Sequence, residues 1–309
     1  MNKVVITGAT GMIGRTLIEY LLNKNIKVLA ITRENSKKLN VLPNHKNLKV
    51  IECNLSNLSK LEQPENDYDT FYHLAWDGTF GNSRNDLDIQ NKNIVYTIEA
   101  IHLAKRLGCK TFIGAGSQAE YGRVDGIIDE NTKTNPENGY GIAKLKAGNL
   151  SRIEANKYNI KHIWTRIFSV YGPYDRDKTM IMSSIKHMLE GTSPDYTKGE
   201  QIWDYVYSED VAKALYLIGK KGKNNAIYCI AQGKTKPLKE YIEILKNKID
   251  NNIELKLGTI PYSDKQVMNL SVNINKLTKE IGFIPETSFE EGIEKTISWY
   301  KGSGKYEEN

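Results

Sequence analysis

Short apolar runs alternate with stretches of helical periodicity along the first part of the chain. The apolar runs end in glycine, serine or other polar residues, which is typical of buried strands, whereas the intervening segments repeat apolar residues every three or four positions. The pattern predicts strands at residues 3–7, 28–32, 48–53, 70–75, 111–117 and 162–170, and helices at 12–23, 90–107 and 140–157. This alternation predicts an α/β fold with a doubly wound parallel sheet of the Rossmann type and right-handed crossovers.

The pattern changes after Gly172-Pro173. From here it predicts helices at 178–190, 208–219, 237–248 and 289–300, with short strands at 226–232 and 253–257. We therefore predict a first domain at residues 1–171 and a smaller α/β lobe at 172–301 that holds the substrate. The polar, glycine-containing tail at 302–309 is expected to be disordered.

The charge balance of the 309 residues is mildly basic. The 43 Lys and Arg residues against 37 Asp and Glu give a formal net charge of +6, so nucleic-acid binding is not expected, although anionic small molecules would be favoured. Cys53, Cys109 and Cys229 lack metal-ligand spacing, so we expect free thiols and no metal. No secretory leader and no membrane-spanning apolar stretch are visible, which predicts a cytoplasmic protein without membrane partners.

A glycine-rich turn follows the first predicted strand. Residues 3–7 run directly into Gly8-Ala-Thr-Gly11-Met-Ile-Gly14, which opens the first helix. Glycines at such spacing let the turn tighten, let the backbone approach a pyrophosphate and let the helix pack closely on the strand, while free N–H groups at the helix N-terminus attract phosphate. Strand, turn and helix in this order predict a dinucleotide site, and a purely structural turn is the alternative.

Tyr140 and Lys144 are four positions apart in the predicted helix at 140–157, so their side chains share one face. A neighbouring cation favours the phenolate form of a phenol, which would let the pair exchange a proton with a substrate oxygen near neutral pH. The pair therefore predicts carbonyl–alcohol redox chemistry, with an ordinary helix surface as the alternative. Ser117, Ser169 and the glycine turn all lie at or just beyond predicted strand ends, so these motifs converge on one crevice.

The glycine turn, Ser117 and the Tyr140/Lys144 pair together resemble the extended short-chain dehydrogenase/reductase family, also called the NAD-dependent epimerase/dehydratase family. This family includes nucleotide-sugar epimerases, dehydratases and 4-ketoreductases. The resemblance runs from about residue 3 to Tyr300 and includes the stretches Tyr72-His-Leu-Ala75, Asn93-Ile-Val-Tyr-Thr97, Arg166-Ile-Phe-Ser-Val-Tyr-Gly-Pro173, Asp204-Tyr-Val-Tyr-Ser-Glu-Asp-Val-Ala212 and 289–300. It implies that elements of the second half return to the first domain.

The resemblance implies a role for each site residue. Tyr140 would be the general acid/base, Lys144 would lower the pKa of Tyr140 and hold the nicotinamide ribose, and Ser117 would hydrogen-bond the substrate oxygen. His73 is expected to be a packed strand-end residue, and Asn93 is expected to order backbone of the active site. The implied cofactor-binding residues are Gly8, Thr10, Gly11, Met12, Ile13, Gly14, Arg33, Asn54, Leu55, Leu74, Ala75, Trp76, Asn93, Tyr140, Lys144 and Ile167.

The end of the second predicted strand bears on the choice of cofactor. An NAD enzyme usually places an acidic residue there on the ribose hydroxyls, whereas this chain has Thr32 and Arg33 before Glu34. A guanidinium matches a 2′-phosphate by charge and by geometry, and Arg15 is a second candidate for that contact. We therefore predict NADP(H), with NAD(H) bound through Glu34 as the alternative.

Departures from the family pattern narrow the reaction. Sugar-nucleotide 4,6-dehydratases generally carry Thr-Asp-Glu where this chain has Ser117-Gln-Ala119, so a dehydratase is disfavoured. The stretch at 116–122 resembles 4-ketoreductases of deoxysugar pathways, such as CDP-abequose synthase and TDP-6-deoxyhexose 4-reductases. We predict NADPH-dependent reduction of the C4 carbonyl of a nucleotide-activated 4-keto-6-deoxyhexose. The alternatives are an NAD-dependent nucleotide-sugar 4-epimerase and, least favoured, a non-catalytic dinucleotide-binding regulator.

Gln118, Ser169 and Trp203 are predicted to contact the nucleotide-sugar substrate. Ser169 and Trp203 stand where many relatives have an Asn and an Arg that serve the nucleotide, and core packing is an equal alternative for Trp203. The residues expected to contact the diphosphate instead are Arg176, Lys178 or Lys186.

The resemblance also implies a homodimer that packs through the helices near 91–107 and 140–157. The alternative is that these helices pack only on the sheet of their own chain. The candidate apolar seam is formed by Ile94, Ile98, Ile101, Leu145, Leu150 and Ile153.

Overall fold

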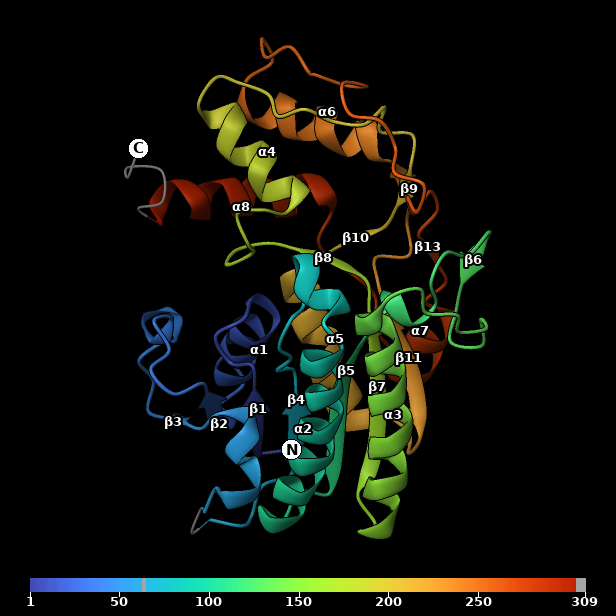
Figure 1. The fold of residues 1–309 in the computed structure, drawn as a ribbon. Coiled ribbons are helices and arrows are strands. Elements are labelled where there is room, and N and C mark those ends of the chain that lie inside the picture. Colours follow the sequence, from blue (N-terminus) through green and yellow to red (C-terminus); the bar gives the residue numbers. More distant parts are fainter. Residues whose placement is uncertain (63–64, 304–309) are drawn as a thin grey trace.

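A central parallel sheet organises the computed structural model, which describes residues 1–62 and 65–303 (Figure 1). Its strands are β1 (Lys3–Thr7), β2 (Lys27–Thr32), β3 (Leu48–Glu52), β4 (Thr70–His73), β5 (Thr111–Ser117), β7 (Lys161–Ile167) and β11 (Ala226–Ile230). They lie in the order β11-β7-β5-β4-β1-β2-β3, and every neighbouring pair is parallel. The order turns back at β1, which is the doubly wound arrangement, so the predicted fold class is confirmed.

Helices cover both faces of the sheet because both faces of its strands are buried. Val4 and Ile6 of β1 belong to a core cluster with residues of the helices α1, α5 and α7, whereas Val5 belongs to a second cluster with residues of α2. Side chains alternate between the faces of a strand, so each strand serves both clusters. The helices are α1 (Met12–Leu22), α2 (Leu87–Arg106), α3 (Gly139–Lys157), which packs beside α2, α5 (Ser208–Lys221) and α7 (Asn275–Ile281).

The smaller lobe lies above the sheet in Figure 1 and has an aromatic core. The ring of Phe289 lies 4.5 Å from that of Tyr241 and 4.9 Å from that of Tyr171, measured between centroids. Its helices are α4 (Met180–Leu189), α6 (Leu238–Ile249) and α8 (Phe289–Gly302). Short strands pair around it: β8 (Ser169–Tyr171) with β10 (Tyr205–Tyr207), β9 (Ile202–Trp203) with β12 (Lys236–Pro237), and β6 (Ile127–Ile128) with β13 (Ser271–Val272).

Two strands predicted for the smaller lobe have a different outcome. The run at 226–232 forms β11, which pairs with β7 of the main sheet through partners such as Ala226 and Ile163. The strand predicted at 253–257 is wrong, because the structure has only an isolated bridge from Lys256 to Asp195 there. The alternating apolar residues that suggested it pack into the core of the smaller lobe without a partner strand.

Other differences concern the ends of elements. The strand predicted at 162–170 is divided into β7 and β8 at Phe168, whose N–H bonds to Ile230. The predicted tail begins inside α8, and its residues beyond 303 lie outside the described residues. In the part of the chain that the structure describes, no helix combines the length and apolarity needed to cross a bilayer. Short 3-10 turns complete the chain: η1 (Leu39–Val41), η2 (Leu55–Lys60), η3 (Gly81–Asn85) and η4 (Gln118–Glu120).

Candidate active site

A cleft of about 830 Å³ opens at the carboxyl ends of β1, β4, β5 and β7. The smaller lobe contributes Trp203 and Tyr205 to its wall. Its volume lies in the range of small-molecule sites, roughly 300–1,000 Å³, and doubly wound sheets bind their ligands outside this edge. The cleft is therefore the candidate active site.

The glycine turn fits a pyrophosphate. Gly8 has a φ of 74°, and a Cβ there would lie 2.7 Å from the backbone nitrogen of Ala75. A Cβ on Gly14 would lie 2.2 Å from the carbonyl oxygen of Gly8, so the turn closes only with glycine at both positions. Gly11, the N-cap of α1, offers no side chain to the first N–H groups of the helix, which border the cleft. Open N–H groups at a helix N-terminus suit the phosphates of a dinucleotide.

The start of α3 brings Tyr140 to Ser117. Asn138 caps the helix by accepting a hydrogen bond from the N–H of Gly141 at 2.9 Å. A Cβ on Gly141 would lie 2.3 Å from the carbonyl oxygen of Ala119, so this turn approaches the segment after β5 only with glycine there. Burial raises the pKa of Tyr140, and the hydroxyl of Ser117 lowers it as a hydrogen-bond partner. The predicted acid/base and the predicted substrate-binding hydroxyl therefore share one site.

Lys144 lies one helical turn beyond Tyr140. Its Nζ donates to the carbonyl oxygen of Ala115 at 2.7 Å and lies 3.7 Å from the centroid of the Trp76 ring. Burial lowers the pKa of Lys144 to about 7, so charged and neutral forms are both populated near neutral pH. The same Nζ lies 5.8 Å from the centroid of the Tyr140 ring, which allows both groups to act on one ligand.

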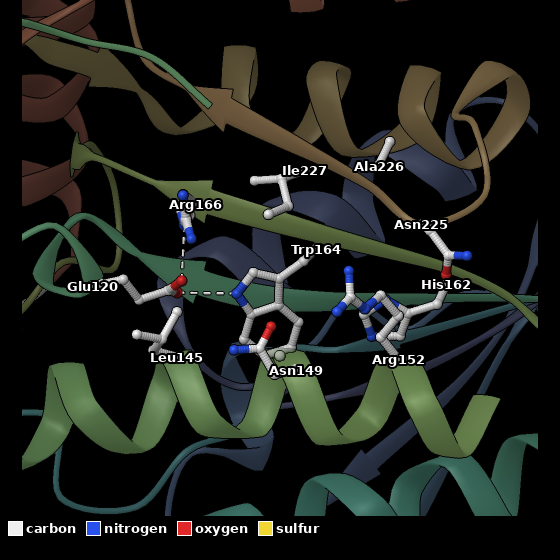
Figure 2. Close-up of a pocket in the computed structure, with 11 residues that line it drawn as sticks. Glu120, Leu145, Asn149, Arg152, His162, Trp164, Arg166, Asn225, Ala226 and Ile227 are labelled. Atoms are coloured by element: carbon white, nitrogen blue, oxygen red, sulfur yellow. Dashed lines mark hydrogen bonds and ion pairs between the residues drawn. The ribbon is translucent and has the colours of Figure 1, made fainter. Parts of the chain in front are cut away.

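The buried carboxylate of Glu120 lies behind the cleft, where Figure 2 shows it joined to Trp164 and Arg166. Glu120 Oε1 accepts from the N–H of Ser117 at 2.9 Å and from Nε1–H of Trp164 at 3.0 Å. Its Oε2 accepts from Nε–H of Arg166 at 2.8 Å. Glu120, Trp164 and Arg166 border a separate cavity of about 20 Å³ between α3 and the sheet. Glu120 thus holds the end of β5, where the Ser117 hydroxyl faces the cleft.

Two of the predicted cofactor-binding residues are not among those that line the cleft. The buried Asn93 holds the backbone of Asp77 by accepting from its N–H and donating to its C=O, both at 2.9 Å. Asn54 accepts from the N–H of Glu34 at 3.2 Å. Both residues therefore shape the rim of the site. The others line the cleft: Gly8, Thr10, Gly11, Met12, Ile13, Gly14, Arg33, Leu55, Leu74, Ala75, Trp76, Tyr140, Lys144 and Ile167.

His73 and Arg15 are both buried and contact other side chains of the protein. His73 is buried between two threonine hydroxyls, and burial lowers its pKa to about 3. Arg15 is also buried, donates to the hydroxyl of Tyr174 at 3.2 Å and pairs with Glu19 at 2.8 Å. Arg15 is therefore engaged between the two lobes, which corrects the expectation that it assists a 2′-phosphate.

The three predicted substrate residues form a chain along the cleft. Nε1–H of Trp203 donates to Oγ of Ser169 at 2.9 Å, and the Ser169 hydroxyl donates to Oε1 of Gln118 at 3.5 Å. All three line the cleft. Trp203 also belongs to the apolar surroundings of the smaller lobe, so packing and pocket roles coincide in this residue.

Several residues that line the cleft belong to no motif recognised in the sequence. Lys38 and Arg84 line the cleft, as does Arg176, which the sequence offered as one of three diphosphate contacts. Asp175 lines it as well, and burial raises the pKa of its carboxyl to about 6. Lys38 and Arg84 lie in polar loops, where their basic character was the sole signal. The other two diphosphate candidates, Lys178 and Lys186, are not among the residues that line the cleft.

Residues 4–231 match the NAD dependent epimerase/dehydratase family. The chain belongs to this family. The family and the enzyme class predicted from the sequence are thereby confirmed, and the family description specifies a nicotinamide dinucleotide as the cofactor.

Members of the family resemble this chain along nearly its whole length. CDP-abequose synthase of Salmonella muenchen is 27% identical over 302 residues, which cover 96% of this chain and 97% of the relative. UDP-glucuronate 4-epimerase of Thermodesulfobacterium geofontis is 26% identical over 315 residues, or 97% of each chain. The solved UDP-N-acetylglucosamine 4-epimerase of Methanobrevibacter ruminantium, in complex with UDP-N-acetylmuramic acid, matches with a TM-score of 0.88 and 26% identity over 98% of this chain and 99% of its own.

Proposed function

We propose that this family member reduces the C4 carbonyl of a nucleotide-activated 4-keto-6-deoxyhexose with NADPH. The observation that carries the proposal is the meeting of the glycine turn, Ser117, Tyr140 and Lys144 in one cleft. Gln118 and Ala119 stand where a dehydratase would need an acid and a base, so the cleft supports proton and hydride transfer without loss of water. The likeness to CDP-abequose synthase supports the substrate class.

Tyr140 is the proton donor of this reaction. When bound, the dihydronicotinamide supplies a hydride to the carbonyl carbon. The phenol of Tyr140 gives its proton to the carbonyl oxygen, while the hydroxyl of Ser117 donates a hydrogen bond to the same oxygen as negative charge develops. Lys144, whose pKa is about 7, places a positive charge near the resulting phenolate and binds a ribose hydroxyl.

Two basic residues support NADP(H) as the cofactor. Arg33, which directly follows β2, and Lys38, further along the chain after that strand, both line the cleft. The carboxylate of Glu34 accepts a hydrogen bond from the amide of Asn57 at 3.3 Å, and Glu34 is not among the residues that line the cleft. A guanidinium and an ammonium in this place suit a 2′-phosphate. NAD(H), bound through Glu34, is the alternative.

A nucleotide-sugar 4-epimerase is the second candidate, and the likeness to a solved UDP-N-acetylglucosamine 4-epimerase favours it. In that reaction Tyr140 would remove the proton of the C4 hydroxyl and return it after the ketosugar has rotated. The two candidates differ in stoichiometry: a reductase consumes one cofactor molecule in each turnover, whereas an epimerase restores its own.

We also propose a homodimer formed through α2 and α3. Val95, Leu150 and Ile153 on these helices are exposed by 57%, 46% and 55%, which leaves apolar surface for a second copy. Ile101 is fully buried in the core of its own chain, so it is not part of the seam expected from the sequence. Ile153→Glu should therefore give a monomer by light scattering, and a wild-type protein that is already monomeric would refute the proposal.

The deciding experiment follows NADPH absorbance with CDP-, TDP-, GDP- and UDP-linked 4-keto-6-deoxyhexoses. Stoichiometric oxidation of NADPH by one of them supports the ketoreductase. No oxidation, together with tightly retained NAD and interconversion of UDP-hexoses, would refute it in favour of the epimerase. Tyr140→Phe should lower kcat by about 10²–10⁴-fold with little change in cofactor affinity, and Tyr158→Phe, at the far end of α3, is the matched control.

A further inference from the structure

Arg84 of η3 lies over the ring of Tyr140. The guanidinium carbon is 4.3 Å from the centroid of the ring, and Nη1 donates to the carbonyl oxygen of Thr79 at 3.2 Å. Within residues 1–62 and 65–303, Arg84 has no ion-pair partner. Both Arg84 and Tyr140 line the cleft. A cation at this distance is attracted by the π face of a phenol and more strongly by a phenolate.

The fold holds this contact in place. Asn85, the neighbour of Arg84, accepts from the N–H of Gly139 at 3.0 Å, one residue before Tyr140. A Cβ on Gly139 would lie 3.0 Å from the carbonyl oxygen of Arg84, so η3 and the first turn of α3 are in direct contact. Gln90 of α2 holds the segment that leads into η3 by donating to the carbonyl oxygens of Gly78 and Ser83, both at 2.8 Å. The guanidinium is therefore attached to a fixed backbone.

We propose that Arg84 is a positioning residue that holds the ring of Tyr140 and stabilises its phenolate. The inference rests on the proposed reaction, in which Tyr140 is the proton donor. The guanidinium of Arg84 lies nearer to the ring of Tyr140 than the ammonium of Lys144 does, at 4.3 Å against 5.8 Å from the centroid. The groups around the phenol are Lys144 of α3, Arg176 after β8, Glu120 of η4 and the neutral Ser117 and Trp76.

Arg84 opposes the effect of burial on the phenol. Burial raises the pKa of Tyr140 and Glu120 adds to this, whereas Ser117, Arg84 and Arg176 lower it. Lys144, with a pKa of about 7, carries only part of a charge at neutral pH, but a guanidinium stays charged at every working pH. When the O–H bond of Tyr140 breaks, the proton passes to the substrate oxygen and the electron pair stays on the phenolate, next to this permanent cation.

The test is an NMR titration of the protein labelled with ¹³C at the tyrosine Cζ, with oxidised dinucleotide bound (NADP⁺, or NAD⁺ where NADP⁺ does not bind). Tyr140→Phe identifies the signal. Wild type is compared with Arg84→Gln and Arg84→Lys. Arg106→Gln is the matched control, because it removes the same charge at the other end of α2, roughly 30 Å away.

Arg84→Gln should raise the pKa of Tyr140 by about 1 unit, Arg84→Lys should raise it by less, and the control should leave it unchanged. In the NADPH assay, the alkaline limb of kcat/KM should move upward by the same amount, because the donor stays protonated to higher pH. An unchanged titration in Arg84→Gln, or an equal shift in Arg106→Gln, would overturn the inference. A shifted titration without reduction of any ketosugar would refute the proposed function and leave the role of Arg84 in place.

Discussion

Glu120→Gln removes the charge from a buried ion pair while it keeps the size of the side chain. The side chains of Glu120 and Arg166 are 1% and 4% exposed. The three groups that face the carboxylate, from Ser117, Trp164 and Arg166, are all donors, so the new amide must point an N–H group at another donor. Breaking a buried pair in this way costs about 3–5 kcal/mol of unfolding free energy, a large share of the total of about 5–15 kcal/mol typical of a protein.

Denaturant unfolding, followed by circular dichroism, measures this loss as a lower midpoint at an unchanged slope. Glu137→Gln is the control, because it breaks an ion pair to Arg123 that lies on the surface, and it should cause little change. Arg166→Met in the Glu120→Gln background should restore part of the loss, since removing both partners leaves no unpaired buried charge. A loss no larger than that of the control, or no recovery in the double variant, would refute the assigned role of the pair.

Gly14→Ala should weaken dinucleotide binding by about tenfold or more in calorimetry, because its Cβ would lie 2.2 Å from the carbonyl oxygen of Gly8. Gly302→Ala is the control: its Cβ would meet nothing within 4 Å, so dinucleotide affinity should not change. Arg33→Gln should lower the preference for NADPH over NADH by about tenfold, read as a ratio of KM values, and an unchanged ratio would contradict its role. Burial lowers the pKa of His162 to about 4, so between pH 6.5 and 4 the unfolded chain binds a proton that the folded chain lacks. The resulting contribution of about 3 kcal/mol is present above pH 6.5 and lost as the pH falls to 4, and His162→Phe should flatten this part of the stability curve.

The parts of the site that depend on local spacing could be predicted from the sequence. The spacing of the glycines is recognised within a few residues, and Tyr140 and Lys144 are neighbours on one helical face, so recognition of either motif needs no knowledge of distant contacts. The alternation of apolar runs and helical segments predicted the parallel sheet for the same reason, because each strand and helix of the first domain has its own periodic signal.

The remaining parts depend on contacts between distant segments. The strand at 226–230 has an apolar pattern, but only pairing with β7 decides which sheet it joins. Arg84 lies in a polar loop, and its place over Tyr140 follows from a bond between Asn85 and Gly139 that joins positions 54 residues apart. Glu120 resembles any exposed acid in the sequence, yet the fold buries it against Arg166.

The return of the chain to the main sheet also limits how this protein can be recombined. After β7 the chain contributes α4 to the smaller lobe and then comes back as α5 and β11, which complete the sheet. Consider a chimera with a single junction at residue 171, in which everything after that residue comes from another family member. It would exchange the edge strand β11 together with the smaller lobe, and its foreign α5 would no longer match the surface of α1 against which it is buried. Transfer of the specificity of another family member therefore requires separate grafts, one between β8 and β10 and others after β11, with α5, β11 and the sheet-packing helix α7 retained from this chain.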